Sequence, residues 1–420
     1  MSSTPRIPAL APFQVRSFRF QWPADLATSW AFEMETLILG WYVLVETQSV
    51  MLLTLFAALL YIGTLLAPIV GVFGDRIGHR NLLCAMRAIY ATLATTLTIL
   101  TFAGVLTPLY VLAITAVMGM VRPSDIGMRA TLVGETMPSD RLMGAMSIQR
   151  TTQDSARVAG ALSGAGLVAA VGMGPAYLMV VSFYTISFLL TLKAGGARSA
   201  SHRAGDAAGE VRPSPWRDLK AGVAYVWNAP PLLALMMLAF LLNLTAFPLL
   251  NGLQPYVAKE IYGTDQTGLG YLVAGAAFGA LVGSVALSRF GGAFPAARMM
   301  IFACVTWYSM LFVFAQMLHP ATGIPFLILA GCAQSFSQVP MAAMILRAAD
   351  VKFRGRVMGL RMLAIYGNLP GLLLAGPLIG RFGYPATATL YCVIGLTFTA
   401  LIAVRWRAHL WRLTAPANTR

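Results

Sequence analysis

The chain has 420 residues, of which 58% are hydrophobic and only 11% are charged, and its mean hydropathy is +0.72. A soluble protein carries about 25% charged residues, so this composition excludes a soluble globular protein and indicates a polytopic membrane protein. The formal net charge is +15, which we attribute to basic cytoplasmic loops, and we expect no nucleic-acid partner.

In chain order, twelve apolar segments are each long enough to cross a bilayer as a helix, which takes roughly 20 residues. Their approximate ranges are 22–45, 48–72, 82–105, 109–133, 142–168, 175–193, 230–258, 266–288, 297–318, 322–346, 357–380 and 384–405. Pro248 and Pro255 interrupt the seventh segment, as expected where a gating helix bends.

A polar stretch rich in Gly, Ala, Ser and Pro covers residues 194–217, between the sixth and seventh apolar segments, and Trp216–Asn228 then has the pattern of an amphipathic helix. We therefore predict an all-α membrane protein with twelve transmembrane helices in two pseudo-symmetric six-helix bundles. The expected parts are an N-terminal bundle (1–193), a cytoplasmic linker (194–229) and a C-terminal bundle with a cytoplasmic tail (230–420).

The basic residues are distributed unevenly among the loops. The even-numbered loops and both tails hold most of them, among them Arg76, Arg80, Arg141, Arg289, Arg298 and Arg405, whereas the odd-numbered loops hold only Lys259 and Arg381. Since basic loops stay on the cytoplasmic side, we expect a multi-pass protein of the cell inner membrane with both termini in the cytoplasm.

The usual signatures of enzymes and metal sites are absent from the sequence. Cys84, Cys304, Cys332 and Cys392 are far apart and form no CxxC pair, so neither a disulfide framework nor a zinc site is expected. No G-x-x-x-x-G-K-[ST] or HExxH motif occurs. We expect no enzymatic activity, no metal and no cofactor.

A short charged loop interrupts the apolar runs Val50–Val70 and Leu82–Val105: Gly71-Val72-Phe73-Gly74-Asp75-Arg76-Ile77-Gly78-His79-Arg80. It resembles the loop signature of the major facilitator superfamily, with His79 where the first Arg of the final pair is usual. The resemblance implies a transporter with two related halves. It also implies a gating loop that latches the outward-facing state, to which we assign Gly71, Gly74, Asp75, Arg76, Gly78, Arg80 and Asp125.

In such a loop the aspartate caps a neighbouring helix and the arginines pair with acids at helix ends. The alternative is a solvated turn that only sets topology. A weaker copy of the signature, Gly283 followed by Arg289-Phe290-Gly291, lies about half a chain later.

Two further matches support a repeat. Arg141-Leu142-Met143-Gly144 recurs as Arg356-Val357-Met358-Gly359, and Gly160-Ala161-Leu162-Ser163-Gly164 aligns with Gly376-Pro377-Leu378-Ile379-Gly380, at offsets of 215 (141 to 356) and 216 (160 to 376). Such repeats predict a substrate site at the interface of two bundles.

The G-P-x-x-G pattern is associated with antiporters when it lies in the fifth span. In the fifth span of this chain Ala161 stands in place of the proline. The alternative role of these small residues is to permit close packing between helices.

Within the superfamily, the chain is similar to the bacterial exporter branch that includes the enterobactin exporter. That similarity rests on Phe18-Arg19-Phe20, Ser29, Ser49 and the segment Tyr225–Pro230.

Charged residues inside the expected spans define the candidate site, because ionisable groups there are costly. Arg122, Asp125 and Arg129 share one helix face in the fourth span, as do Arg150, Asp154 and Arg157 in the fifth. Matching depths predict that Arg122 pairs with Asp154 and Asp125 with Arg150. Arg157 then faces the cavity or a ligand without a partner. Two interpretations stay open: a static network that fixes helix packing, or a site that responds to substrate or proton.

The first span carries two glutamates, Glu33 and Glu35, about 200° apart around the helix. We predict that Glu33 is the cavity carboxylate and that Glu35 packs against another helix, with an arginine as its partner. An apolar environment favours the neutral carboxyl, which suits reversible protonation, and we assign proton coupling to Glu33, Asp154 and Glu35. The alternative for Glu33 is a structural partner of Arg150 or Arg157. Asp25 is expected to be a helix-end charge.

The second half offers polar and aromatic side chains in place of charges. Together with Arg122, Arg150 and Arg157, the predicted substrate cavity includes Asn243, Asn251, Gln254, Trp307, Gln334, Gln338 and Asn368. The alternative for each polar residue is a hydrogen bond between helices.

We predict a secondary active transporter that works as a monomer by alternating access, with membrane lipid, protons and a small-molecule substrate as its partners. The first hypothesis is a proton-coupled antiporter for efflux of a small amphiphile: siderophore export, multidrug export or export of a metabolite. The second is an importer or facilitator of a small organic anion. A non-transporting membrane scaffold or sensor is the third.

Overall fold

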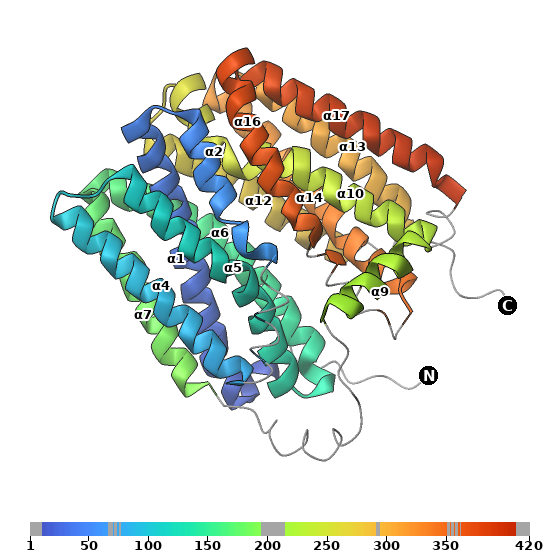
Figure 1. The fold of residues 1–420 in the computed structure, drawn as a ribbon, viewed down its shortest axis with the longest axis horizontal. Coiled ribbons are helices and arrows are strands. Elements are labelled where there is room, and N and C mark those ends of the chain that lie inside the picture. The colour runs from blue at the N-terminus through green and yellow to red at the C-terminus, as the bar shows by residue number, and fades with distance from the viewer. Residues whose placement is uncertain are drawn as a thin grey trace. The chain divides into compact units, whose positions relative to one another are not determined.

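The computed structural model describes residues 11–65, 70, 74, 77–194, 215–290, 295–350, 353, 357, 360–361 and 363–408. All regular secondary structure in this part of the chain is helical (Figure 1). The fold is therefore the all-α membrane fold that the sequence predicts.

The helices up to residue 194 alternate with short turns. They are η1 (Ala11–Gln14), α1 (Arg16–Thr47), α2 (Val50–Leu59), η2 (Ile62–Leu65), α4 (His79–Phe102), α5 (Pro108–Thr136), α6 (Ser139–Val171) and α7 (Met173–Lys193). Ser49 begins α2 as its N-cap, because its hydroxyl accepts a hydrogen bond from the Leu52 amide.

The later helices follow the same pattern. They are α9 (Pro215–Trp227), α10 (Pro230–Phe247), η3 (Pro248–Gly252), α11 (Gln254–Tyr256), η4 (Val257–Ile261), α12 (Gln266–Phe290), α13 (Ala296–Ala315), α14 (Pro320–Ala348), η6 (Ile365–Gly367), α16 (Asn368–Phe382) and α17 (Tyr384–Arg405). The expected bend in the seventh span is confirmed: α10 ends at Phe247, and Pro248 opens a π-helical turn because proline cannot donate the next backbone hydrogen bond.

Eight of the described helices are long and apolar enough to cross a membrane: α4, α5, α7, α10, α12, α13, α14 and α17. Four other expected spans are also helical. Of these, α1 and α6 are long but rich in ionisable residues, and α2 and α16 are shorter.

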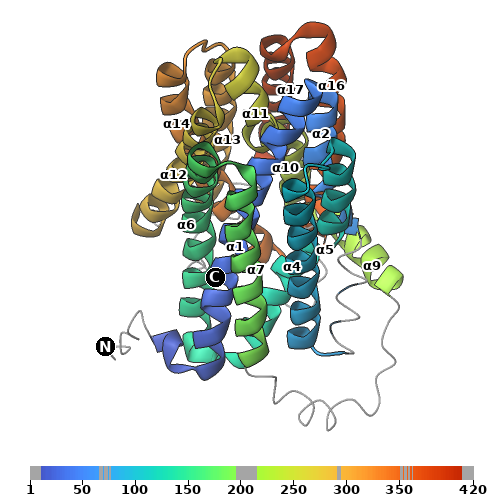
Figure 2. The same ribbon diagram turned by 90° about the vertical axis from the view of Figure 1, so that its left-hand side faces the viewer.

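Contacts divide the chain into two compact units. The first comprises Met1–Ile38 and Leu66–Arg212, and the second comprises Leu39–Leu65 and Pro213–Arg420. Helix α1 therefore contributes its first part to one unit and its last part to the other, and α2 belongs to the second unit. In the first unit α4 packs along α7 (Figure 2); in the second, α14 packs against both α12 and α13.

Glycines allow several helix pairs to touch along their backbones. A Cβ atom at Gly279 of α12 would collide with the Ile328 carbonyl of α14, and Gly275 and Gly283 also face α14. Gly160 and Gly164 of α6 pack against α1 in the same way. Small residues at four-residue spacing are a common means of close packing between membrane helices.

Gly376 of α16 belongs to the segment 376–380, which aligns with residues 160–164 in the sequence, and it also allows close packing between helices. A Cβ atom there would lie 2.5 Å from Thr54 Oγ1 of α2. The second copy of the repeat therefore forms a helix-packing surface in the second unit, as Gly160 and Gly164 do in the first.

Candidate functional site

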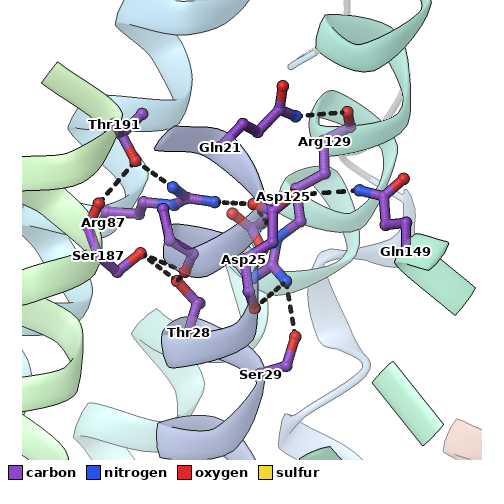
Figure 3. A network of polar contacts seen from close by, with 11 residues as sticks. Gln21, Asp25, Thr28, Ser29, Arg87, Asp125, Arg129, Gln149, Ser187 and Thr191 are labelled. Atoms are coloured by element: carbon purple, nitrogen blue, oxygen red, sulfur yellow. Dashed lines mark hydrogen bonds and ion pairs between the residues drawn. The ribbon is translucent and has the colours of Figure 1, made fainter. Parts of the chain in front are cut away.

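The buried polar network of the first unit centres on Asp25 of α1 (Figure 3). Its carboxylate pairs with Arg87 of α4, lies 3.8 Å from Arg129 Nε of α5, and accepts a hydrogen bond from Gln149 Nε2 of α6 at 3.2 Å. One carboxylate thus links four helices. The expectation that Asp25 is a charge at a helix end is wrong, because Asp25 is only 4% exposed and enclosed by the neighbouring spans.

Arg87 is the functional candidate that sequence reasoning missed. Its side chain is fully buried, and besides Asp25 it donates to the hydroxyl of Thr191 on α7. Arg87 interrupts the apolar run of the third span, and an isolated ionisable residue inside a span was the signal that could have found it.

Asp125 and Arg129 complete the network from α5. Arg129 Nη2 lies 2.5 Å from Asp125 Oδ2, and Arg129 Nη1 donates to the Ser29 hydroxyl at 2.8 Å. The expected pairing of Asp125 with Arg150 is wrong, because an arginine one helical turn away on the same helix reaches the carboxylate first. Two carboxylates, Asp25 and Asp125, balance two arginines, Arg87 and Arg129, so the network is formally neutral.

A cavity of about 110 Å³ adjoins this network and is lined by α1, α4, α5 and α6. Four arginines line it: Arg122, Arg129, Arg150 and Arg157. Three acids also line it: Glu33, Asp125 and Asp154. All three arginines that the sequence assigns to the cavity are thus in its wall, and the lining carries a formal surplus of one positive charge (four minus three).

An ion pair between two helices crosses the cavity wall. Arg157 Nε of α6 lies 3.7 Å from Glu33 Oε1 of α1, with the two side chains 37% and 20% exposed. Gly160, about one helical turn after Arg157 on α6, allows this approach because it has no side chain and so leaves room for Glu33 of α1. The expectation that Arg157 lacks a partner is wrong; the structure shows the alternative, in which Glu33 is that partner.

The other two cavity arginines have different contacts. Arg150 Nε lies 3.3 Å from Asp154 Oδ2 on the same helix, so the expected pairing of Asp154 with Arg122 is wrong for the same geometric reason as that of Asp125. The guanidinium of Arg122 instead stacks on the ring of Phe32, 3.0 Å from its centroid. Such stacking holds a cation against an aromatic face.

Glu35 points away from the cavity, toward α7. Its carboxylate accepts hydrogen bonds from the Tyr177 hydroxyl at 2.9 Å and the Tyr184 hydroxyl at 2.7 Å, and Glu35 is only 3% exposed. Glu33 and Glu35 therefore lie on different sides of α1, as the helical period predicts. The partner of Glu35 on the adjacent helix is a pair of tyrosines rather than an arginine.

The polar residues expected in the second half of the cavity lie in the second unit. Asn368 of α16 donates to Asn243 Oδ1 of α10 at 3.0 Å, and both are buried. This contact is the interhelical hydrogen bond that was the alternative interpretation. Trp307 is fully buried with its ring edge-to-face against Phe247 at 5.2 Å.

The remaining members of this set differ in exposure. Gln254 and Gln334 are buried, Gln338 is partly buried and Asn251 is exposed. Their assignment to a substrate cavity stays a prediction.

Part of the expected gating loop, namely Gly71, Asp75 and Arg76, lies outside the described residues. Gly78 precedes α4 with a φ of +88°, a conformation that favours glycine. Gly74 is buried, and a Cβ atom there would lie 3.0 Å from Met128 Sδ.

The two basic residues after Gly78 contact different helix ends. Arg80 donates to the carbonyls of Thr191 and Leu192 at the end of α7, rather than to an acid as expected, because terminal carbonyls of a helix attract cations. His79 Nδ1 lies 2.8 Å from Glu135 Oε1, near the end of α5. His79, which stands where the first Arg of the signature's final pair is usual, thus contacts an acid near a helix end.

The structure combines a helical membrane fold with arginine–carboxylate pairs around a small polar cavity, an arrangement that is typical of membrane transporters. The sequence profile of the Major Facilitator Superfamily matches residues 26–367, and the chain belongs to that superfamily. This assignment agrees with the signature of the charged loop.

Solved structures of several transporters are similar to this fold. The nucleoside transporter NupG matches with a TM-score of 0.69 and 13% identity over 93% of this chain and 98% of its own. A POT family transporter in complex with 5-aminolevulinic acid matches with a TM-score of 0.73 and 12% identity (94% and 96% covered). A D-xylose-proton symporter matches with a TM-score of 0.68 and 12% identity (92% and 97% covered).

At these identities the similarity concerns the fold alone. No curated protein matches the sequence.

Proposed function

We propose that this protein is a proton-coupled secondary transporter of a small organic anion, or of an amphiphile with an anionic group. The observation that carries this proposal is the Glu33–Arg157 pair in a cavity whose lining already has one surplus positive charge. An anion entering this cavity meets exposed guanidinium groups on Arg150 and Arg157, which suit carboxylates and phosphates.

The same pair supplies a physical basis for coupling. When Glu33 takes up a proton, the lining changes from four positive and three negative groups to four and two, and Arg157 is released toward the cavity. Proton binding then strengthens anion binding, and by linkage anion binding strengthens proton binding to the same extent. The state of the protein that binds the anion most tightly is therefore the one in which Glu33 is protonated.

This positive linkage bears on the direction of transport. A proton and an anion that bind together cross together, which favours cotransport down an inward proton gradient and hence the organic-anion importer. An antiporter requires proton and substrate to exclude one another, as a cationic substrate competing for Glu33 would do. Export of an amphiphile, favoured by the resemblance to the exporter branch, remains the second candidate.

The proposed setting is the inner membrane, with both termini in the cytoplasm and the protein acting as a monomer. The support is the concentration of Arg and Lys in the even-numbered loops and the tails.

The decisive experiment uses proteoliposomes with a pH-sensitive dye inside and a panel of carboxylates, siderophores and cationic drugs outside. Cotransport predicts acidification of the lumen when the right anion is added to the wild type. Glu33→Gln, which resembles the protonated residue, is expected to bind that anion without dependence on pH and to move no protons. Glu46→Gln is the matched control, because Glu46 is an exposed glutamate of the same helix and does not line the cavity.

Three other outcomes would contradict the proposal in different ways. Luminal alkalinisation on substrate addition would establish antiport. Uptake of labelled anion without proton movement would show that the protein is a facilitator that is not coupled to protons. No flux of any compound, with the protein folded, would favour the scaffold or sensor.

A further inference from the structure

A long apolar groove lies on the second unit between α13 and α14, with a volume of about 750 Å³. Phe302 of α13 forms one wall and is 73% exposed. Ala303 of α13 and Ala333 of α14 are only 5% and 6% exposed and form the floor. Small residues on the floor and large ones at the rim make a slot rather than a flat face.

Helix α14 packs closely against α12 next to the groove. Gly275, Gly279 and Gly283 of α12 face its backbone, and a Cβ atom at Gly283 would meet Cys332, which also lines the groove. The alanines that face α13 leave the space of the slot open.

The groove lies between α13 and α14, which are both long and apolar enough to cross a membrane, so we expect its open side to face lipid. Its lining on α13 runs from Arg298 to Met310. The twelve steps from residue 298 to residue 310, at 1.5 Å rise each, span about 18 Å, slightly more than half of the ~30 Å hydrocarbon core. That is the depth occupied by the acyl chains of one leaflet.

One end of the groove is charged. Arg298 is the basic residue in its lining, and its side chain is exposed. It lies in the first turn of α13, at the end that we expect on the cytoplasmic side from the distribution of basic residues, where anionic headgroups attract cations. A guanidinium group also matches the geometry of a phosphate.

We infer that the groove between α13 and α14 binds one anionic phospholipid of the cytoplasmic leaflet, with an acyl chain along Ala303 and Ala333 and the headgroup at Arg298. The position of a cation at the mouth of an otherwise apolar slot selects an anionic lipid over a zwitterionic one. This site is separate from the cavity of the first unit and does not depend on which substrate is transported.

The first test is native mass spectrometry of the full-length protein in detergent with phosphatidylglycerol or phosphatidylcholine of equal chain length. Wild type is expected to retain one phosphatidylglycerol at least fivefold more readily than phosphatidylcholine. Arg298→Gln should abolish this preference, and Arg298→Lys should restore most of it. Arg347→Gln is the matched control, since Arg347 is also exposed, lies on the same predicted side and is not part of the groove.

Filling the slot tests the acyl-chain part of the site. Ala303→Leu or Ala333→Leu is expected to reduce retention of both lipids, whereas Ala343→Leu, an exposed position of α14 outside the groove, should not. Wild-type protein gives an independent measurement: Cys332 lies in the groove and is partly exposed, whereas Cys84, Cys304 and Cys392 are buried. Added phosphatidylglycerol should slow alkylation of Cys332 severalfold.

Equal retention of the two lipids by wild type, an unchanged preference in Arg298→Gln, or alkylation of Cys332 at the same rate with and without lipid would each overturn the inference.

Discussion

Arg157 on α6 and Glu33 on α1 form the ion pair that joins two helices across the cavity wall, with 3.7 Å between Nε and Oε1. Both side chains are partly exposed, so the pair can open without removing a deeply buried charge from its partner. We expect exposed pairs of this kind to contribute only ~0–1 kcal/mol to stability. In the proposed mechanism a proton replaces Arg157 as the partner of Glu33, while the anion replaces Glu33 as the partner of Arg157.

The first prediction concerns Arg157. Arg157→Gln should weaken binding of the transported anion at least tenfold, because hydrogen bonds to charged groups contribute about 1.5–3 kcal/mol and 1.4 kcal/mol corresponds to a factor of ten. The melting temperature should change little. Isothermal titration calorimetry against the anion found in the vesicle assay would measure the effect. Arg381→Gln, an exposed arginine outside the cavity, should bind like wild type.

The second prediction concerns the buried pair Asp25–Arg87. Arg87→Met leaves the network with two carboxylates and one arginine, and breaking a buried pair costs about 3–5 kcal/mol. Adding Asp25→Leu restores neutrality, so the double variant should be more stable than Arg87→Met alone. Thermal unfolding in detergent measures both. Equal melting temperatures of the two variants would show that the pair is not energetically coupled.

The third prediction separates Glu35 from proton coupling. Because Glu35 faces Tyr177 and Tyr184 rather than the cavity, Glu35→Gln should retain wild-type proton movement in the vesicle assay. Tyr184→Phe removes a donor to a buried carboxylate and should cost about 1–3 kcal/mol of stability. Tyr110→Phe, at an exposed position, is the control. Loss of proton movement in Glu35→Gln would transfer the coupling role from Glu33 to Glu35.

The fourth prediction concerns the α12–α14 contact. Gly279→Ala places a methyl group against the Ile328 carbonyl, and overpacking of this kind costs about 1–3 kcal/mol. Gly380→Ala should be neutral or slightly stabilising, since a Cβ atom at Gly380 meets no described neighbour within 4 Å. We expect the melting temperature of Gly279→Ala, measured in the same detergent, to be lower than that of Gly380→Ala. A stable Gly279→Ala protein would mean that the helices can separate at little cost.

The fold was largely predictable from the sequence, because a long apolar segment in a bilayer must form a helix that satisfies its own backbone hydrogen bonds. The expected fourth, sixth, ninth and twelfth spans all coincide closely with observed helices, and prolines 248 and 255 correctly marked the interruption of the seventh. The second expected span (48–72) is described only in part: α2 ends at Leu59, a 3₁₀ helix follows over Ile62–Leu65, and residues 66–69 and 71–73 lie outside the described residues.

The sequence placed Glu33, Arg122 and Arg157 among the residues that line the first-unit cavity, but it did not predict how the charged residues pair. Equal depth in the membrane predicted that Arg122 pairs with Asp154, but depth does not determine the direction in which a side chain points. Asp154 and Asp125 instead pair with the arginine one helical turn away on their own helix. Asp25 was misjudged because it lies near the start of the expected first span (22–45), whereas α1 already begins at Arg16. The tyrosine partners of Glu35 lie 142 and 149 residues away in sequence, and no local pattern relates them.

The Asp25 network also has a consequence for biogenesis. Asp25 lies in α1, which is synthesised before α4 and α5, the helices that carry its basic partners Arg87 and Arg129. Until then the insertion machinery must hold a carboxyl group in or near the membrane without its final counter-charges. The nascent chain should therefore become firmly anchored only after α4 has left the ribosome, so that assembly of this unit follows the order in which its charges emerge.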